Sequence, residues 1–152
     1  MSPSSRPHRR GAAAIEFAMW LPVLIMFLSA VVDWGHHWNQ RVAVARAVME
    51  GTRSAATVYE GPTVLPPGSK IAQKARDRTE RVLTDLGIPC PSAKCVLQAN
   101  WCNTGAATCG APPFQAVRVR VQLDYAPLIG MVPTPTSISE EFVMATEYQR
   151  LP

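Results

Sequence analysis

Histidine and charge are scarce in this chain, and their scarcity excludes several classes of protein. Only three of the 152 residues are histidines, and charged residues make up 17% of the total. The sequence contains no glycine-rich phosphate-binding loop and no zinc-binding pair of histidines on a helix. Asp33 and His37 stand four residues apart, but two ligands do not make a structural zinc site. We therefore expect no catalytic residue, no metal site and no cofactor, and we do not predict an enzyme.

Basic charge is concentrated at the amino terminus. Three of the fifteen cations, Arg6, Arg9 and Arg10, lie within the first ten residues. From residue 12 onward the chain has 12 cations and 11 anions, a net charge of +1. This near-balance leaves no basic surface for a phosphate backbone, so no nucleic-acid partner is expected.

Residues 11–32 form an apolar stretch with a single ionisable group. About 20 helical residues span the roughly 30 Å hydrocarbon core of a bilayer, so the stretch predicts a transmembrane helix over 12–33. The arginines before this helix and Asp33 at its end predict a cytoplasmic amino terminus and an outer carboxyl-terminal part. Trp34 and Trp38 stand where an outer aromatic belt is expected.

Three interpretations of this apolar segment compete. A secretory signal peptide has a shorter apolar core and a small-residue cleavage site, and no such site is clear near Ser29. An uncleaved anchor fits the length but does not explain Glu16. A carboxylate in an apolar span costs a few kcal/mol, which makes Glu16 a functional-site hypothesis unless it snorkels to the nearby inner surface.

The third interpretation is a prepilin processing site. Gly11-Ala-Ala-Ala-Ile-Glu16 follows a basic leader, residues 1–11, and opens the apolar helix. This arrangement resembles type IV prepilins, in which cleavage follows the glycine and a glutamate is the fifth mature residue. The wider stretch to Asp33-Trp-Gly35, with residues 48–56 beyond it, is similar to the TadE-like family. Members of that family are minor pseudopilins of tight-adherence (Flp, type IVb) pili.

The resemblance implies a non-catalytic role in assembling or priming such a pilus. A prepilin peptidase would cut between Gly11 and Ala12, where glycine presents no side chain to the protease. Glu16 would pair with the amino terminus of a neighbouring subunit, which offsets the cost of burying both charges. The expected partners are the membrane, the peptidase, other pilin and pseudopilin subunits and the assembly machinery.

The expected location is the cytoplasmic membrane, with incorporation into a surface pilus left open. The resemblance is to the minor class, because main-shaft Flp subunits are much shorter than this chain. The alternative function is a single-pass, membrane-anchored extracytoplasmic adaptor that is unrelated to pili and keeps its leader.

The apolar helix is predicted to continue outward over residues 34–60. Small and apolar residues recur there at helical spacing. The members of this stripe are Val44, Val48, Gly51, Ala55 and Val58. No strong helix breaker follows Pro22 before Gly61, and the alternative is a break at Gly35. Small residues such as Gly51 permit close approach of another element, either this protein's own sheet or a partner subunit.

An outer domain is predicted over residues 69–152, after a proline- and glycine-rich linker at 61–68. Ser69 is the expected N-cap of a helix over 70–86. The residues expected on the apolar face of this helix are Ile71, Ala75, Val82 and Leu86. Candidate strands cover 95–101, 116–125 and 137–148, and the second alternates apolar with polar residues. A long membrane-spanning helix followed by a helix and an antiparallel sheet predicts an α+β, pilin-like fold.

Four cysteines lie in the predicted outer domain: Cys90, Cys95, Cys102 and Cys109. Their spacing is not that of a zinc ribbon. An even number of cysteines in an oxidising compartment favours two disulfides over a metal site or free thiols. Four cysteines allow three connectivities, and the sequence does not choose between them.

Overall fold

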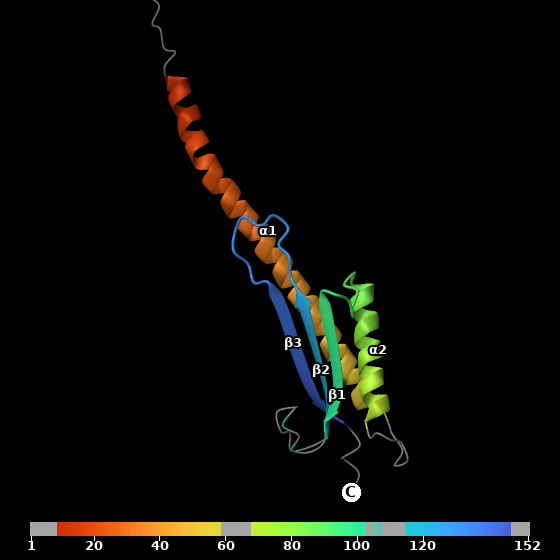
Figure 1. Cartoon of the computed structure of the whole chain (residues 1–152). Coiled ribbons are helices and arrows are strands. Elements are labelled where there is room, and N and C mark those ends of the chain that lie inside the picture. Colours follow the sequence, from red (N-terminus) through yellow and green to blue (C-terminus); the bar gives the residue numbers. More distant parts are fainter. Residues whose placement is uncertain (1–8, 59–67, 103–104, 106, 108–114, 147–152) are drawn as a thin grey trace, which may run out of the picture. The chain divides into compact units, whose positions relative to one another are not determined.

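The computed structural model describes residues 9–58, 68–102, 105, 107 and 115–146 (Figure 1). In this part of the chain the elements follow in the order α1 (Arg9–Ala56), α2 (Ser69–Asp85), β1 (Cys95–Cys102), β2 (Ala116–Asp124) and β3 (Ser137–Ala145). The predicted α+β class is confirmed: a long apolar helix is followed by a second helix and an antiparallel sheet.

The chain divides into two compact units, and α1 contributes to both. The first unit, here called the helix–loop unit, holds the chain up to His37 together with the loop Ala126–Thr134. The second, here called the sheet unit, holds Trp38–Tyr125 and the chain from Pro135 onward.

Helix α1 is continuous through Pro22 and Gly35. The alternative of a break at Gly35 is therefore wrong. Helical continuity has a physical basis here, because an isolated glycine in a helix costs only about 1 kcal/mol relative to alanine. Over residues 13–28 every side chain of α1 is exposed, including Phe17 and Trp20.

In the sheet unit, β2 is the central strand and pairs antiparallel with β1 on one side and β3 on the other (Figure 1). The register places Leu97 opposite Val121, and Val119 opposite Phe142. The predicted alternation along the central strand is confirmed by burial. Val117, Val119, Val121 and Leu123 of this strand are buried, as are Ala116 at its start and Tyr125 directly after it.

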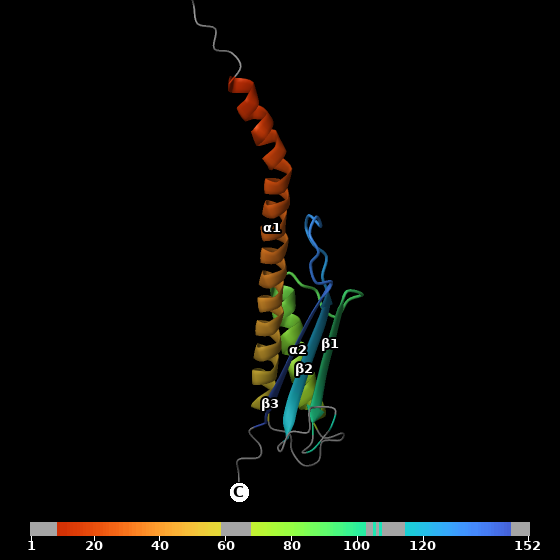
Figure 2. The same ribbon diagram turned by 90° about the vertical axis from the view of Figure 1, so that its left-hand side faces the viewer.

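Both helices cover the same face of this sheet (Figure 2), and one hydrophobic core lies between the two layers. The core residues of α1 are Val44, Ala47, Val48 and Ala55, and those of α2 are Ile71, Ala75 and Leu83. Four members of the predicted stripe, Val44, Val48, Gly51 and Ala55, are thus confirmed as buried. The fifth, Val58, follows the end of α1 and is only partly buried. Full burial of a leucine such as Leu83 contributes roughly 1.5–3 kcal/mol, so this packing holds the two layers together.

Two details of α2 differ from the sequence prediction. The N-cap is Gly68, with φ 80°, and Ser69 is the first helical residue rather than the cap. Leu86 is 50% exposed because the helix ends at Asp85 and Leu86 is its C-cap. The buried face instead continues at four-residue spacing from Ala75 to Thr79 and Leu83. Thr79 is accommodated because its hydroxyl donates a hydrogen bond to the carbonyl of Ala75, at 2.7 Å.

Gly51 allows α1 to approach α2 closely. A Cβ atom at this position would overlap Oγ1 of Thr79 and lie 2.9 Å from the carbonyl oxygen of Ala75. The close approach therefore involves the protein's own second helix, which is neither of the two neighbours expected from the sequence.

This contact predicts the effect of Gly51→Ala. The added methyl group should lower the free energy of unfolding of the sheet unit by about 1–3 kcal/mol, the usual cost of overpacking, although alanine favours a helix. The matched control is Gly35→Ala in the same helix, since nothing lies within 4 Å of a Cβ there. Urea unfolding of the full chain in detergent, followed by near-ultraviolet circular dichroism, measures both. Equal stability of the two variants would contradict the predicted clash.

Candidate functional site

The predicted processing site lies at the start of α1. Gly11 and Ala12 are both within the helix, and the side chain of Ala12 falls outside the described part of the structure. Glu16 follows one turn later and its side chain is exposed. None of the ion pairs among the described residues involves Glu16. The carboxylate therefore stands on the outer surface of a single chain, where another molecule can reach it.

The surface around and after Glu16 is apolar. Phe17, Trp20, Leu21 and Phe27 all expose large parts of their side chains. Within the described residues, α1 is the one helix long and apolar enough to cross a membrane, judged by length and composition. Exposing so many large apolar side chains to water is unfavourable, so this surface suggests a single-pass membrane anchor.

Asp33 has a role that the sequence analysis missed. Its side chain is fully buried, at 0% exposure, and it binds the loop Ala126–Thr134 of the same unit. Oδ1 accepts a hydrogen bond from the backbone N–H of Ile129, and Oδ2 accepts one from the N–H of Gly130, each at 2.9 Å. Hydrogen bonds to a carboxylate are roughly twice as strong as neutral ones. Asp33 thus anchors a loop that lies 96 residues away in the sequence.

Gly130 suits this geometry because its φ is 73°, in the left-handed region that favours glycine. Two successive N–H groups that point toward one anion form a small anion-binding concavity of the backbone. Here the anion is the protein's own carboxylate, because Asp33 fills the anion-binding position of the loop.

Buried polar side chains recur every four residues around this point. Ser29, Asp33 and His37 are buried, while Val31 and Val32 beside them are exposed. The Ser29 hydroxyl is satisfied within the helix, because it donates to the carbonyl of Met26 at 2.9 Å. A helix facing water shows the reverse pattern, with apolar residues inside and polar residues outside. Residues 29–37 of α1 are therefore suited to apolar surroundings.

A comparison with protein families identifies this stretch. The family model described as TadE-like protein matches residues 11–53. Over these residues the chain is similar to that family. The predicted family resemblance is confirmed there, from Gly11 through Glu16 and Asp33. Comparisons with curated proteins and with solved structures found no match.

The TadE-like segment therefore contains the predicted cleavage site, the exposed Glu16 and the buried Asp33, and it ends within the sheet unit. In the described residues, no three His, Cys, Asp or Glu side chains are grouped so that they could hold a metal ion. The segment carries three carboxylates: Glu16 is exposed, Asp33 is hydrogen-bonded to the loop, and Glu50 forms an ion pair with Arg78 of α2.

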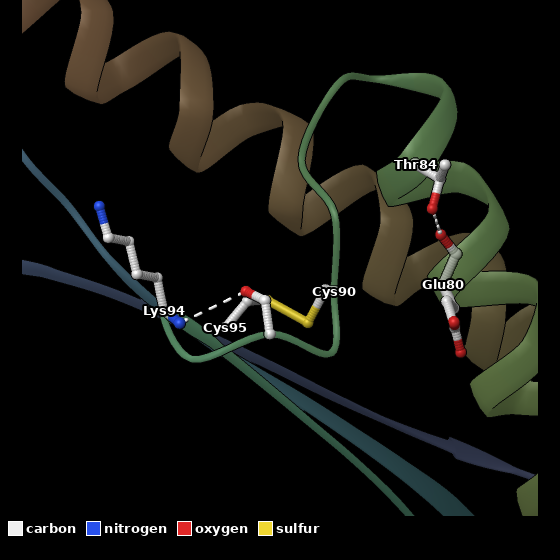
Figure 3. The surroundings of a disulfide bond; sticks show 6 residues. Glu80, Thr84, Cys90, Lys94 and Cys95 are labelled. Atoms are coloured by element: carbon white, nitrogen blue, oxygen red, sulfur yellow. Dashed lines mark hydrogen bonds between the residues drawn. A yellow bond between two sulfur atoms is a disulfide. The ribbon is translucent and has the colours of Figure 1, made fainter.

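The cysteines lie outside the TadE-like segment. Cys90 and Cys95 form a disulfide across the turn that leads from α2 into β1 (Figure 3). Both half-cystines are buried, and their Cα atoms are 5.3 Å apart. Within the same turn the N–H of Ser92 donates to the Cys95 carbonyl at 2.9 Å, and the N–H of Cys95 donates to the Ser92 carbonyl at 3.1 Å. The bridge therefore reinforces a turn that the backbone already closes.

Cys102, at the end of β1, is also disulfide-bonded. Cys109 lies outside the described residues. The prediction of disulfides is thus confirmed for the bridge between Cys90 and Cys95, one of the pairings that the sequence left open.

The anchoring of the loop predicts the effect of Asp33→Asn. The amide replaces one acceptor oxygen with a donor that faces a backbone N–H, and a lost hydrogen bond to a charged group costs about 1.5–3 kcal/mol. Hydrogen exchange of the Ile129 and Gly130 amides should therefore become roughly tenfold faster or more. The control Asp124→Asn changes an exposed carboxylate at the end of β2. Unchanged exchange at the two loop amides in Asp33→Asn would show that the carboxylate does not hold the loop.

The disulfide predicts a specific peptide map. Trypsin cleaves after Lys94, between the two half-cystines, so the unreduced digest should contain two peptides joined through Cys90 and Cys95. Replacing both residues with serine should lower the free energy of unfolding by about 2 kcal/mol, as expected for so short a closed loop. Recovery of four free thiols from protein in its native membrane would contradict both the pairing and the outer location.

Proposed function

We propose that this chain is a non-catalytic minor pseudopilin that acts in assembling or priming a tight-adherence (Flp, type IVb) pilus. The observation that carries the proposal is the TadE-like match over residues 11–53, which suggests involvement with such a pilus. The sheet unit, with its disulfide, adds a globular part that favours a minor component over a main-shaft subunit.

Processing is the first step of the proposed function. A prepilin peptidase on the cytoplasmic side cuts the peptide bond after Gly11, removes the basic leader and leaves the α-amino group of Ala12 at or near the membrane. The orientation follows from the three arginines of the leader, which stay on the cytoplasmic side. The chain is then held in the cytoplasmic membrane by a single helix, with its sheet unit outside.

Pairing between subunits is the second step. The Glu16 side chain is exposed on an apolar helix and has no ion-pair partner among the described residues, which supports a partner from another molecule. A carboxylate at this depth costs a few kcal/mol, and the new amino group of a neighbouring subunit offsets that cost. An apolar residue at position 16 would insert into the membrane equally well, but it would not fix the position of one subunit relative to the next.

The runner-up function is a membrane-anchored extracytoplasmic adaptor unrelated to pili. The apolar helix supports it equally well, because any single-pass protein needs one. The mature amino terminus separates the two functions, since an adaptor has no reason to be cut after Gly11.

The test combines processing and piliation in the organism's own pilus system. Gly11→Val adds bulk at the cut, so the unprocessed mass should accumulate in the membrane. Glu16→Leu should be processed and inserted normally but should abolish or strongly reduce surface pili. Glu16→Asp should be intermediate, because it keeps the charge and shortens the reach by one methylene group.

Two measurements, intact mass of the membrane protein and surface piliation, are made on each variant. A normal mature mass in Gly11→Val would contradict cleavage at this bond. Full piliation with Glu16→Leu would mean that the carboxylate only snorkels to the inner surface, and the pairing step would be wrong.

A further inference from the structure

The loop Ala126–Thr134 is unusually apolar for a surface loop. Residues 125–139, which include it, contain no charged side chain. Leu128, Ile129 and Met131 are 63%, 47% and 60% exposed. Surface loops are normally polar, and clustered exposed apolar side chains mark an interaction site. The loop therefore has an outer surface suited to an apolar environment.

The position of the loop along α1 is set by Asp33, whose carboxylate oxygens accept from Ile129 and Gly130. Asp33 lies 17 positions after Glu16, a distance of about 26 Å along a helix. The hydrocarbon core of a bilayer is roughly 30 Å thick. When α1 spans a membrane with Glu16 at the inner boundary, Asp33 and the bound loop lie at the outer boundary. Figure 1 shows this loop beside α1.

The backbone of the loop is prepared for a poorly hydrated environment. Irregular backbone is costly near lipid because its N–H groups need partners. Pro127 and Pro133 have no N–H group, and the N–H groups of Ile129 and Gly130 are taken up by Asp33. The remaining donors require some water, which places the loop in the interfacial zone and not in the hydrocarbon centre.

The helix beside the loop has the same organisation. Ser29 and Asp33 are buried, while Val31, Val32 and Trp34 are exposed. In both segments of the helix–loop unit, polar groups face inward and apolar side chains face outward. This pattern suits lipid, because apolar side chains gain nothing from exposure to water.

We propose that the loop Ala126–Thr134 is a second membrane contact, which inserts Leu128, Ile129 and Met131 into the outer interface of the bilayer beside the exit point of α1. This inference rests on one part of the proposed function, the spanning of a membrane by α1. The occupant of the apolar loop surface is lipid. Because the loop joins β2 to β3, lipid contact of the loop gives the sheet unit a second non-covalent attachment to the membrane besides α1.

The experiment places an environment-sensitive fluorophore (a nitrobenzoxadiazole maleimide) on Met131→Cys in the full chain. No free cysteine competes for the label among the described residues. The protein is reconstituted into vesicles of phosphatidylethanolamine and phosphatidylglycerol that contain nitroxide-bearing lipids, either near the headgroup or deep in the acyl chains. The probe on Met131→Cys should show blue-shifted emission and should be quenched more strongly by the shallow nitroxide than by the deep one.

Two matched positions calibrate the depth. Phe27→Cys is an exposed apolar position within the charge-free run of α1, and its probe should be quenched more by the deep nitroxide. Val96→Cys on β1 is 52% exposed, close to the exposure of the loop residues, and its probe should remain in water and unquenched.

Each other outcome overturns the inference for a different reason. A probe on Met131→Cys that behaves like the one on Val96→Cys would show that the loop lies in water. A blue-shifted but unquenched probe would show that protein, such as a second copy of this chain, covers the loop. A probe on Phe27→Cys that is also unquenched would show that α1 does not span the bilayer, so the membrane step of the proposed function would fail together with the inference.

Discussion

A single helix must satisfy two different environments, and the rest of the structure depends on this constraint. The first part of α1 exposes large apolar side chains, whereas the last part buries Val44, Val48 and Ala55 against a sheet. The helical repeat stays the same, and only the placement of apolar residues around it changes. Because the backbone hydrogen bonds are satisfied within the helix throughout, one continuous element can serve as a membrane anchor and as a layer of a folded core.

The parts of the fold that depend on local periodicity could be predicted from the sequence. Alternation along β2 identified its buried face, and helical spacing identified the stripe of α1 that is buried in the core. Both patterns work because burial follows the repeat of the backbone. The prediction of Leu86 as a core residue was wrong for a related reason: the helix ends at Asp85, beyond which the helical repeat no longer applies.

The contacts that depend on distant segments could not be predicted. Asp33 binds a loop 96 residues away, and a lone acidic residue at the end of an apolar run carries no sign of its partner. The four-residue spacing of Ser29, Asp33 and His37 is visible in the sequence. That these polar side chains are buried, while the neighbouring apolar side chains are exposed, is known only from the structure. Gly51 likewise signalled a close approach, and only the structure identifies α2 as the neighbour. The pairing of Cys90 with Cys95 spans only five residues, yet the spacing of the four cysteines did not select it among the three connectivities.

Two of the three carboxylates in the TadE-like segment, Asp33 and Glu16, differ in what remains for them to bind. The third, Glu50, forms an ion pair with Arg78 within the sheet unit. Asp33 is buried, and its two oxygens accept hydrogen bonds from successive backbone N–H groups, so its charge is stabilised within one chain. Glu16 is exposed on an apolar surface and lacks an ion-pair partner in the described part of the molecule. A charge at membrane depth requires compensation, and among the described residues Glu16 has no counterpart to the compensation that Asp33 receives from the loop. The physical distinction between a carboxylate that organises its own subunit and one suited to join two subunits is thus already present along one helix.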